Sequence, residues 1–304
     1  MMSTSRPDVA AVLVSWNPDI DDLALVLDSL LSQVGALVVV DNGSRNVDEV
    51  RNLIHQRQAV TLIALSENRG VSAALNIGVD KVRHLQPMWI LTMDQDSMVD
   101  DGATNRILDA YDRLDATTRA QCGILALRAY AGPWRLPLTR FTDGLMVIGE
   151  RGDFNERRGV ITSGNLVRTE LFDRIRFDES LFVDQVDFDF CYSVRQNGYL
   201  VLEHKYPSMN HVLGERPIGT KRQHPYENAQ RIYYISRNST RLLLRGRLPP
   251  LFYLCQTILF FGAYLSVNGV WSAWRFLAVF LRGVGDALIG RTGRREYLSE
   301  GRAR

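Results

Sequence analysis

The chain has 304 residues, of which 46% are hydrophobic and 23% are charged, and its formal net charge is +2. This balance is typical of globular proteins and excludes intrinsic disorder, a collagen-like chain and a bare coiled coil. The three cysteines are odd in number and widely spaced, which fits neither a disulfide framework nor a tetrahedral zinc site and favours a reducing compartment.

Strand and helix patterns alternate along the first 130 residues. The first eight residues lack the apolar stretch of a secretory signal, so we expect no export. Short β-rich runs predict strands at 9–15, 37–41, 60–65, 89–94 and 123–130. Helical spacing predicts helices near 21–34, 47–57, 71–85 and 103–114. Apolar strands linked by helices indicate an α/β fold whose sheet is parallel and covered on both faces.

Clusters of polar residues follow three successive predicted strands. They are Asp41-Asn42-Gly43-Ser44, Ser66-Glu67-Asn68-Arg69-Gly70 and Asp94-Gln95-Asp96-Ser97. Each cluster alone is compatible with ordinary turn chemistry. Because parallel sheets bind ligands at the carboxyl ends of their strands, three clusters at three strand ends favour a binding site.

Asp94 and Asp96 lie just beyond a strand, where side chains two residues apart point the same way. Mg²⁺ or Mn²⁺ prefers hard oxygen ligands, usually one or two carboxylates completed by substrate phosphates and water. A lone Asp-x-Asp is more often a solvated acidic turn, but its position after a buried strand favours a divalent cation site here.

A second acidic stretch begins a predicted helix near 184–197 and contains Asp184, Asp187 and Asp189 among phenylalanines. Burial near apolar walls raises the pKa of a carboxylate and makes it a better proton acceptor near neutrality. A helix cap and first-turn acids account for one or two of the three. His211 stands alone in the sequence, and an isolated histidine is more often packed than functional.

The C-terminal part is basic and apolar. Residues 231–304 hold 12 Lys/Arg against 3 Asp/Glu, a net charge of +9, and residues 1–230 have a net charge of −7. No charged residue lies between Arg247 and Arg275. We expect helices at about 226–246, 251–267 and 271–289.

Three interpretations of this C-terminal hairpin remain open. The uncharged run is long enough to span a membrane, but prolines, glycines and polar residues dilute it. Trp271 and Trp274 beside arginines suit the headgroup boundary, so the second interpretation is peripheral contact with anionic lipid. The third is a helical hairpin that packs on the main domain or forms a homodimer.

Several motifs, in this order, resemble those of the family-2 inverting glycosyltransferases with the GT-A fold. They are the three clusters above together with Ala-Leu-Asn-Ile-Gly at 74–78, Thr-Ser-Gly-Asn at 162–165, Asp-x-Asp-Phe-Cys at 187–191 and Arg-Gln-Asn-Gly-Tyr at 195–199. Within the family, the chain most resembles the bacterial rhamnosyltransferases, whose Tyr-Tyr-x-x-Arg-Asn segment matches residues 233–238. The resemblance covers about residues 9–215.

The resemblance implies a GT-A domain over 1–225 and a helical region over 226–304 with possible membrane association. Within the GT-A domain, residues 1–130 would bind a nucleotide sugar and residues 131–225 would form the acceptor side.

No Gly-x-Ser-x-Gly elbow or phosphate loop occurs in the sequence, which argues against the commonest classes of hydrolase and nucleotide-hydrolysing enzyme.

The resemblance also implies residues that bind the donor. Asp41 would accept a hydrogen bond from the nucleotide base, with Asn42 nearby. Asn68, Arg69 and Asn76 would line the base and the ribose. We expect no nucleic-acid partner.

The same resemblance implies which residues would bind the metal and which would act as the catalytic base. Asp94 and Asp96 match the metal motif of the family, with Asp96 the more direct ligand of Mg²⁺ or Mn²⁺, and His211 matches a position that helps to hold the metal or the diphosphate. Gly164 lies in the loop beneath the donor sugar, and Asp187 aligns with the catalytic base. Many relatives have Glu-Asp where this chain has Val186-Asp187, so Asp184 could take part of the role of the missing glutamate.

The implied function is metal-dependent transfer, with inversion, of L-rhamnose from dTDP-β-L-rhamnose to a saccharide or polyprenyl-linked acceptor in cell-surface polysaccharide biosynthesis. One alternative keeps the fold and uses a UDP-sugar such as galactofuranose or galactose. A third hypothesis is a non-catalytic nucleotide-sugar-binding or membrane scaffold protein. We expect a cytoplasmic location, peripheral on the cytoplasmic face of the inner membrane.

Overall fold

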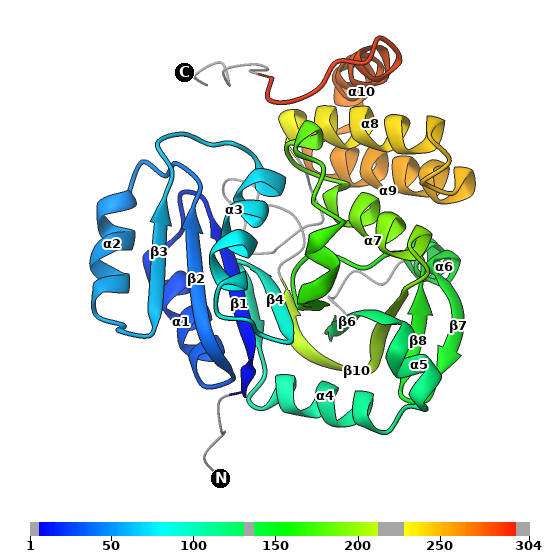
Figure 1. Cartoon of the computed structure of the whole chain (residues 1–304). Helices are drawn as coiled ribbons and strands as arrows, with labels where there is room; N and C mark the ends of the chain where they lie inside the picture. The colour runs from blue at the N-terminus through cyan, green and yellow to red at the C-terminus, as the bar shows by residue number, and fades with distance from the viewer. Residues whose placement is uncertain (1–5, 131–136, 212–227, 296–304) are drawn as a thin grey trace. The chain divides into compact units, whose positions relative to one another are not determined.

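The computed structural model describes residues 6–130, 137–211 and 228–295 (Figure 1). The described residues form two compact units. The first unit contains 6–130, 146–178 and 187–211, and the second contains 137–145, 179–186 and 228–295. The boundary expected between residues 225 and 226 lies outside the described residues.

The first unit is built on a ten-stranded sheet with the order β3-β2-β1-β4-β9-β6-β10-β8-β7, in which β5 also pairs with β10. Its strands are β1 (Arg6–Ser15), β2 (Val34–Asp41), β3 (Val60–Ala64), β4 (Trp89–Asp94), β5 (Ser97–Val99), β6 (Cys122–Ala129), β7 (Val147–Arg151), β8 (Phe154–Arg157), β9 (Asn165–Arg168) and β10 (Leu200–His211). All five strands predicted between residues 9 and 130 are present.

The sheet is mixed: it contains the parallel strands that the sequence predicted and, beside them, antiparallel ones. β1 to β4 run parallel to one another, as expected. β9, which the sequence pattern did not reveal, lies between β4 and β6 and is antiparallel to both. A strand of four residues has too little alternation to be distinguished from a loop. The strands beyond β6 include further antiparallel pairs.

Helices cover both faces of the sheet in this unit. They are α1 (Ile20–Leu31), α2 (Val47–His55), α3 (Val71–Arg83), α4 (Ala103–Asp112), α5 (Ala116–Gln121), the 3-10 turn η1 (Thr169–Asp173) and α7 (Val186–Gln196), whose first residue belongs to the second unit. Leu13 joins the core shared with α1 and α4. Val12 points to the opposite face, where Gly78 lets α3 approach so closely that a Cβ would lie 2.3 Å from the valine methyl.

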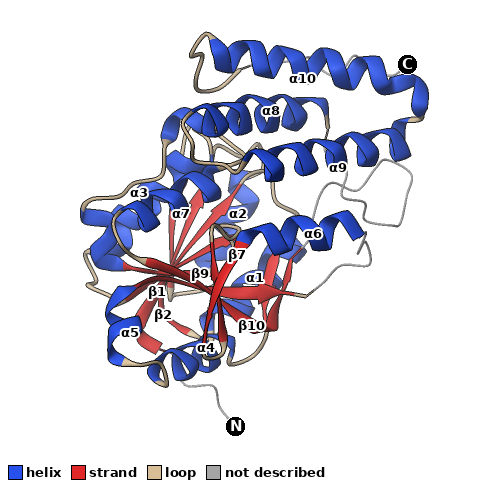
Figure 2. Cartoon of the chain, turned by 90° about the vertical axis from the view of Figure 1, so that its right-hand side faces the viewer, coloured by secondary structure: helices blue, strands red, loops and turns tan. Residues whose placement is uncertain are grey.

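The second unit is helical. It contains most of α6 (Pro137–Met146), η2 (Glu179–Leu181), α8 (Ala229–Leu244), α9 (Pro250–Asn268), η3 (Val270–Ser272) and α10 (Ala273–Leu288). The predicted C-terminal helices are confirmed to within a few residues. α8 contacts both α9 and α10 (Figure 2). α10 crosses α8 at Gly283, where a Cβ would lie 2.7 Å from the Tyr233 carbonyl oxygen.

Candidate functional site

The carboxyl ends of β1, β2 and β4 meet at one edge of the sheet, because the three strands are parallel neighbours. Gln95 ties two of these ends together: its side-chain oxygen accepts from the Trp16 backbone N–H at 2.7 Å. Ser44, after β2, accepts from the Asn17 backbone N–H at 2.7 Å. The polar clusters found in the sequence therefore lie together, as predicted.

Asp41 ends β2 and is completely buried. Its carboxylate accepts hydrogen bonds from the Ser44 backbone N–H at 3.0 Å and from the Ser44 hydroxyl at 2.5 Å. The Ser15 hydroxyl donates to the same carboxylate at 3.5 Å. These bonds fix the loop after β2, and the expected contact of Asp41 with a nucleotide base stays a prediction.

Asn42, Asn68 and Arg69 join the loops after β2 and β3. The Asn42 side-chain amide donates to Asn68 Oδ1 at 3.1 Å, and Asn42 Oδ1 accepts from the Arg69 backbone N–H at 2.9 Å. Asn68 Oδ1 also accepts from the Gly70 backbone N–H at 2.9 Å, directly before α3. The three residues predicted to bind the sugar donor are therefore brought together in one pair of hydrogen-bonded loops.

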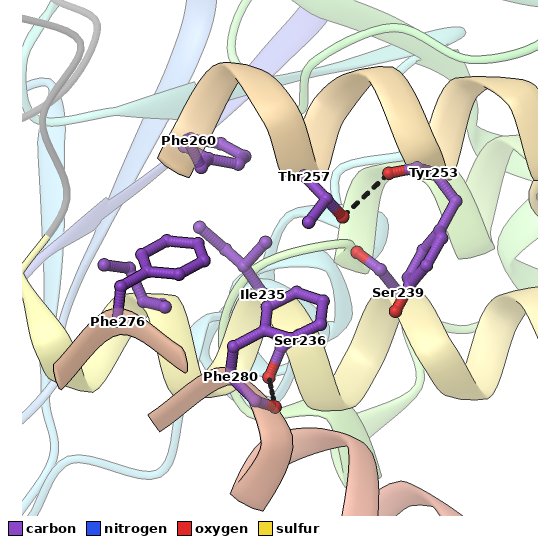
Figure 3. Close-up of a pocket in the computed structure, with 9 residues that line it drawn as sticks. Ile235, Ser236, Ser239, Tyr253, Thr257, Phe260, Phe276 and Phe280 are labelled. Atoms are coloured by element: carbon purple, nitrogen blue, oxygen red, sulfur yellow. Dashed lines mark hydrogen bonds between the residues drawn. The ribbon is translucent and has the colours of Figure 1, made fainter. Parts of the chain in front are cut away.

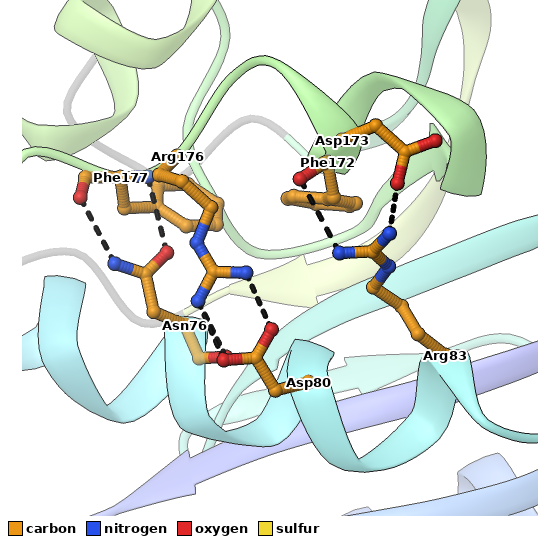
Figure 4. Close-up of polar contacts among 7 residues, drawn as sticks. All are labelled: Asn76, Asp80, Arg83, Phe172, Asp173, Arg176 and Phe177. Atoms are coloured by element: carbon orange, nitrogen blue, oxygen red, sulfur yellow. Dashed lines mark hydrogen bonds and ion pairs between the residues drawn. The ribbon is translucent and has the colours of Figure 1, made fainter.

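Asn76 lies on α3 and is nearly fully buried. Its amide donates to the Phe177 carbonyl at 3.0 Å and its oxygen accepts from the Phe177 backbone N–H at 3.1 Å (Figure 4). Ion pairs of Arg176 with Asp80 and of Arg83 with Asp173 follow this bond pair along α3 (Figure 4). Asn76 thus anchors α3 to the segment after β9, and its role at the nucleotide stays a prediction.

Asp94, Asp96 and His211 form a cluster in which one ligand atom of each lies within 4.8 Å of the others. Asp94 ends β4, Asp96 lies in the following turn, and His211 ends β10. The pairing of β5 with β10 places His211 opposite Ser97 and so brings the histidine to the two carboxylates. Topology therefore unites residues that lie more than a hundred positions apart in the chain.

The donor set of this cluster fits a divalent cation. Two carboxylates and one imidazole suit Mn²⁺, and the carboxylates suit Mg²⁺ as well. The Asp96 side chain is 47% exposed, which leaves room for substrate phosphates and water as further ligands. Ser97 Oγ lies 2.7 Å from His211 Nδ1, the ring nitrogen that also lies 3.8 Å from Asp96 Oδ1, so the serine holds the imidazole beside that carboxylate.

Gly164 lies beside Asp94, in the loop before β9. The Asp94 backbone N–H donates to Ser163 Oγ at 3.1 Å, and the Gly164 backbone N–H donates to the Thr92 carbonyl at 2.8 Å. Gly164 has a φ of +84°, and a Cβ there would meet Met209 Sδ at 2.8 Å. Only glycine fits both the left-handed backbone and the close contact.

Asp187 lies in the first turn of α7 and is half-buried. The Phe188 backbone N–H donates to its carboxylate at 2.9 Å. α7 is anchored in the first unit by Phe190, which stacks on Phe177 with ring centroids 4.1 Å apart. The expected catalytic base and the metal cluster therefore belong to the same compact unit.

The other two acids of this stretch have different surroundings. Asp189 is only 3% exposed. Asp184 belongs to the second unit, where its side chain is 9% exposed and Arg231 Nη2 lies 2.7 Å from its Oδ1. The arginine pairing gives Asp184 a partner that the sequence did not reveal.

Burial argues against cysteine chemistry. All three are free thiols and buried. Burial raises the pKa of Cys122 and of Cys191 to about 12, so neither is a thiolate near neutral pH.

A small pocket lies in the second unit between α8, α9 and α10 (Figure 3). Phe260, Phe276 and Phe280 supply much of its lining, and the Thr257 and Ser236 hydroxyls in it donate to backbone carbonyls. No carboxylate, histidine or cysteine lines it. The pocket therefore offers no acid, base or metal ligand.

Sequence reasoning missed three residues that support the site: Gln95, Ser97 and Ser163. Gln95 and Ser97 lie within the acidic motif, and Ser163 precedes the glycine of Thr-Ser-Gly-Asn. Their position inside these motifs is the sequence signal that could have identified them. Their roles depend on strand neighbours that are distant in sequence.

Two relatives resemble the chain in sequence. The chain is 26% identical over 256 residues to the dTDP-rhamnosyl transferase RfbF of Shigella flexneri, a match that covers 83% of this chain and 85% of that protein. It is 31% identical over 113 residues to the succinoglycan biosynthesis protein ExoO of Rhizobium meliloti (strain 1021), covering 36% of this chain and 31% of that protein.

Solved structures with a similar fold include S. aureus TarS 1-349, with a TM-score of 0.51, 14% identity and coverage of 93% of this chain and 82% of that one. GalNAc-T7 with UDP, GalNAc and Mn²⁺ has a TM-score of 0.53, 14% identity and coverage of 79% and 51%. The expected GT-A fold is confirmed. The pattern of glycosyl transferase family 2 matches residues 11–176, which is more than half of the chain. The chain therefore belongs to glycosyl transferase family 2 and is a glycosyltransferase.

Proposed function

We propose that this glycosyltransferase moves L-rhamnose from dTDP-β-L-rhamnose to a saccharide or polyprenyl-linked acceptor, with inversion and with a divalent cation. The convergence of Asp94, Asp96 and His211 at the edge of the sheet carries the proposal of metal dependence. Similarity to a dTDP-rhamnosyl transferase over most of both chains supports the choice of sugar. Similarity to a succinoglycan biosynthesis protein supports a role in polysaccharide biosynthesis.

The chemistry follows from the charges of the reaction. The bond from the anomeric carbon to the diphosphate breaks, and the negative charge that develops on the diphosphate is neutralised by a cation when one is bound. Asp94 and Asp96 would hold that cation, with His211 as a third ligand. The loop of Gly164 lies next to Asp94 and supports the donor sugar.

Asp187 removes the proton of the acceptor hydroxyl as that oxygen attacks the anomeric carbon. The proton passes to the Asp187 carboxylate, and the electron pair of the breaking C–O bond leaves with the diphosphate. A single displacement of this kind inverts the anomeric carbon, so a β-linked donor gives an α-linked product. General-base catalysis typically contributes about 10²–10⁴ in rate.

The test is turnover of the nucleotide sugar with water as the acceptor. We expect Mn²⁺-dependent release of dTDP from dTDP-β-L-rhamnose that exceeds release of UDP from UDP-galactose and UDP-galactofuranose. Faster turnover of a UDP-sugar would change the proposed donor but not the assignment of the chain as a glycosyltransferase. Binding of nucleotide sugars without any turnover would instead support a scaffold.

We also propose peripheral contact of the C-terminal helices with an anionic membrane. The outer face of α10 exposes Trp274 (64%), Leu281 (63%) and Leu288 (64%), and Trp271, just before α10, is 89% exposed. The acid of α10, Asp286, is buried, so the exposed charges of this helix are arginines. α9 is the one helix among the described residues that is long and apolar enough to cross a membrane.

An aromatic face with arginines matches the headgroup region of an anionic bilayer. We expect the full-length protein to float with vesicles containing phosphatidylglycerol at low salt and to lose this binding at high salt. The double substitution Trp271→Ser/Trp274→Ser should abolish most of the binding, and Leu85→Ser, at a 62% exposed residue of the first unit, is the matched control. No flotation at low salt would indicate packing or a homodimer, which sedimentation would detect.

A further inference from the structure

The segment directly before Asp187 has an uncommon backbone. Phe182, Asp184 and Gln185 have φ angles of +67°, +61° and +63°. Positive φ is uncommon for residues other than glycine and persists only where the surroundings enforce it. Such conformations cluster at functional sites.

Asn238 of α8 enforces this conformation from the inside of the second unit. It is completely buried, and its amide nitrogen lies within hydrogen-bond distance of three carbonyl oxygens in the segment. These are the carbonyl oxygens of Leu181 at 2.9 Å, Val183 at 2.7 Å and Asp184 at 3.0 Å. One side chain thus gathers three carbonyls of a turn in which the Val183 backbone N–H also donates to the Leu181 carbonyl at 2.9 Å.

Arg237 fixes the orientation of Asn238. Its Nε donates to Asn238 Oδ1 at 2.9 Å, so the amide nitrogen of Asn238 must face the segment. Arg237 Nη2 donates to the Leu181 carbonyl at 2.9 Å, and the guanidinium lies over the Tyr234 ring, 4.9 Å from its centroid. Tyr234 in turn packs on Phe182, with ring centroids 5.4 Å apart.

Arg231 holds the last part of the segment. Its guanidinium pairs with the Asp184 carboxylate at 2.7 Å. Gln185 donates to the Gln256 side chain of α9 at 3.3 Å. Residues 233–238 were noted in the sequence only as a motif, and these contacts give each of its Tyr234, Arg237 and Asn238 a target in one short segment.

We propose that Arg231, Arg237 and Asn238 are positioning residues, which hold residues 181–185 so that α7 begins with Asp187 aimed at the acceptor hydroxyl. α7 starts at Val186, one residue after the held segment and one before Asp187. The held segment therefore ends where the first turn of α7 begins. The inference rests on the proposed role of Asp187 as the base.

The test compares substitutions in the full-length protein. Asn238→Ala should lower kcat for dTDP release from dTDP-β-L-rhamnose about 10²-fold, because an error of about 1 Å in a reacting group costs that much. Donor affinity, measured as the thermal shift with dTDP-β-L-rhamnose and Mn²⁺, should stay within about twofold of wild type. Ser236→Ala is the matched control: it removes a buried α8 hydrogen bond to the Phe280 carbonyl and should leave kcat unchanged.

Arg231 provides a variant that is expected to fold, since its side chain is 38% exposed. Arg231→Gln should lower kcat about tenfold, and Arg231→Lys should restore most of it, because lysine keeps the charge opposite Asp184. A double mutant separates positioning from general destabilisation. Asn238→Ala should have little further effect on kcat in an Asp187→Asn background. Both substitutions impair the same proton-transfer step, so their effects should not add.

Three outcomes would overturn the inference in distinguishable ways. Turnover retained by Asp187→Asn would overturn the proposed base and the positioning role with it. An inactive Asp187→Asn protein beside folded Asn238→Ala and Arg231→Gln proteins with wild-type kcat would overturn the positioning role alone. Full additivity in the double mutant would show that Asn238 acts on a different step.

Discussion

The two acidic clusters of this chain look alike in sequence and differ in structure. Asp94 and Asp96 stay together and gain His211 as a third ligand. The acids of the second cluster separate: Asp184 pairs with Arg231, Asp189 is buried, and Asp187 is half-buried at the start of α7. Carboxylates that end a strand keep a common direction, whereas those at a helix start point to different sides.

This difference indicates what each cluster does. Convergent carboxylates repel each other and are suited to share a cation, which offsets that repulsion. Carboxylates with separate surroundings suit separate tasks, of which proton transfer needs only one. Substitution of single carboxylates in each cluster tests this assignment.

Asp96→Ala should abolish transfer and weaken Mn²⁺-dependent donor binding, because a cation site with so few protein ligands cannot spare one. Asp94→Ala should be milder. The measurement is dTDP release together with the thermal shift produced by donor and Mn²⁺. Undiminished Mn²⁺-dependent donor binding by the Asp96 variant would contradict the metal assignment.

Asp187→Asn should lower turnover by about 10²–10⁴ while donor affinity stays near that of wild type, because the amide keeps the volume and removes the proton acceptor. Asp184→Asn and Asp189→Asn are the matched controls and should retain more activity. An inactive Asp184→Asn beside an active Asp187→Asn would assign the base to Asp184. The ion pair of Asp184 with Arg231 argues against that outcome.

Ser97→Ala should weaken Mn²⁺ affinity about 10–100-fold through loss of the group that orients His211. Saturating Mn²⁺ should restore most of the turnover, because both carboxylates remain. Titration of dTDP release with Mn²⁺ measures both quantities. If affinity for Mn²⁺ is unchanged, the imidazole does not contribute to the cation site.

Much of the metal cluster was predictable because it depends on a strong local signal. β4 is an apolar run that ends in Asp94, and the observed strand has the predicted limits of 89–94. His211 was weak in the sequence because its neighbours come from the pairing of β10 with β5, which no local pattern encodes. The β9 strand was missed for the same reason, since four residues become a strand only between β4 and β6.

The second cluster was less predictable because its arrangement is enforced from outside. Phe182, Asp184 and Gln185 have no intrinsic preference for positive φ, so the sequence gives no sign of their conformation. It depends on Asn238, more than fifty residues away. The base assignment therefore came from resemblance to a family, and the structure adds a reason for the motif that contains Asn238.

The smallest effect on stability is expected at Asp80, whose carboxylate forms an ion pair with Arg176. Hydrogen bonding from Arg176 holds the pKa of Asp80 below its usual value. The folded state then binds fewer protons than the unfolded chain, so this stabilisation is complete above the ordinary carboxyl pKa and is lost as pH falls through the lower, folded pKa. Both side chains are partly exposed, so the pair is worth about 0.2–1 kcal/mol.

Asp80→Asn should therefore lower the free energy of unfolding by that small amount at pH 7 and by less at pH 3, while turnover stays at the wild-type rate. Urea unfolding of both proteins at the two pH values measures the difference and cancels the other carboxylates, which titrate equally in both. A loss of turnover without a loss of stability would place Asp80 among the residues that serve the reaction. It would then break the distinction between carboxylates paired with arginine and carboxylates that face the cation or the acceptor.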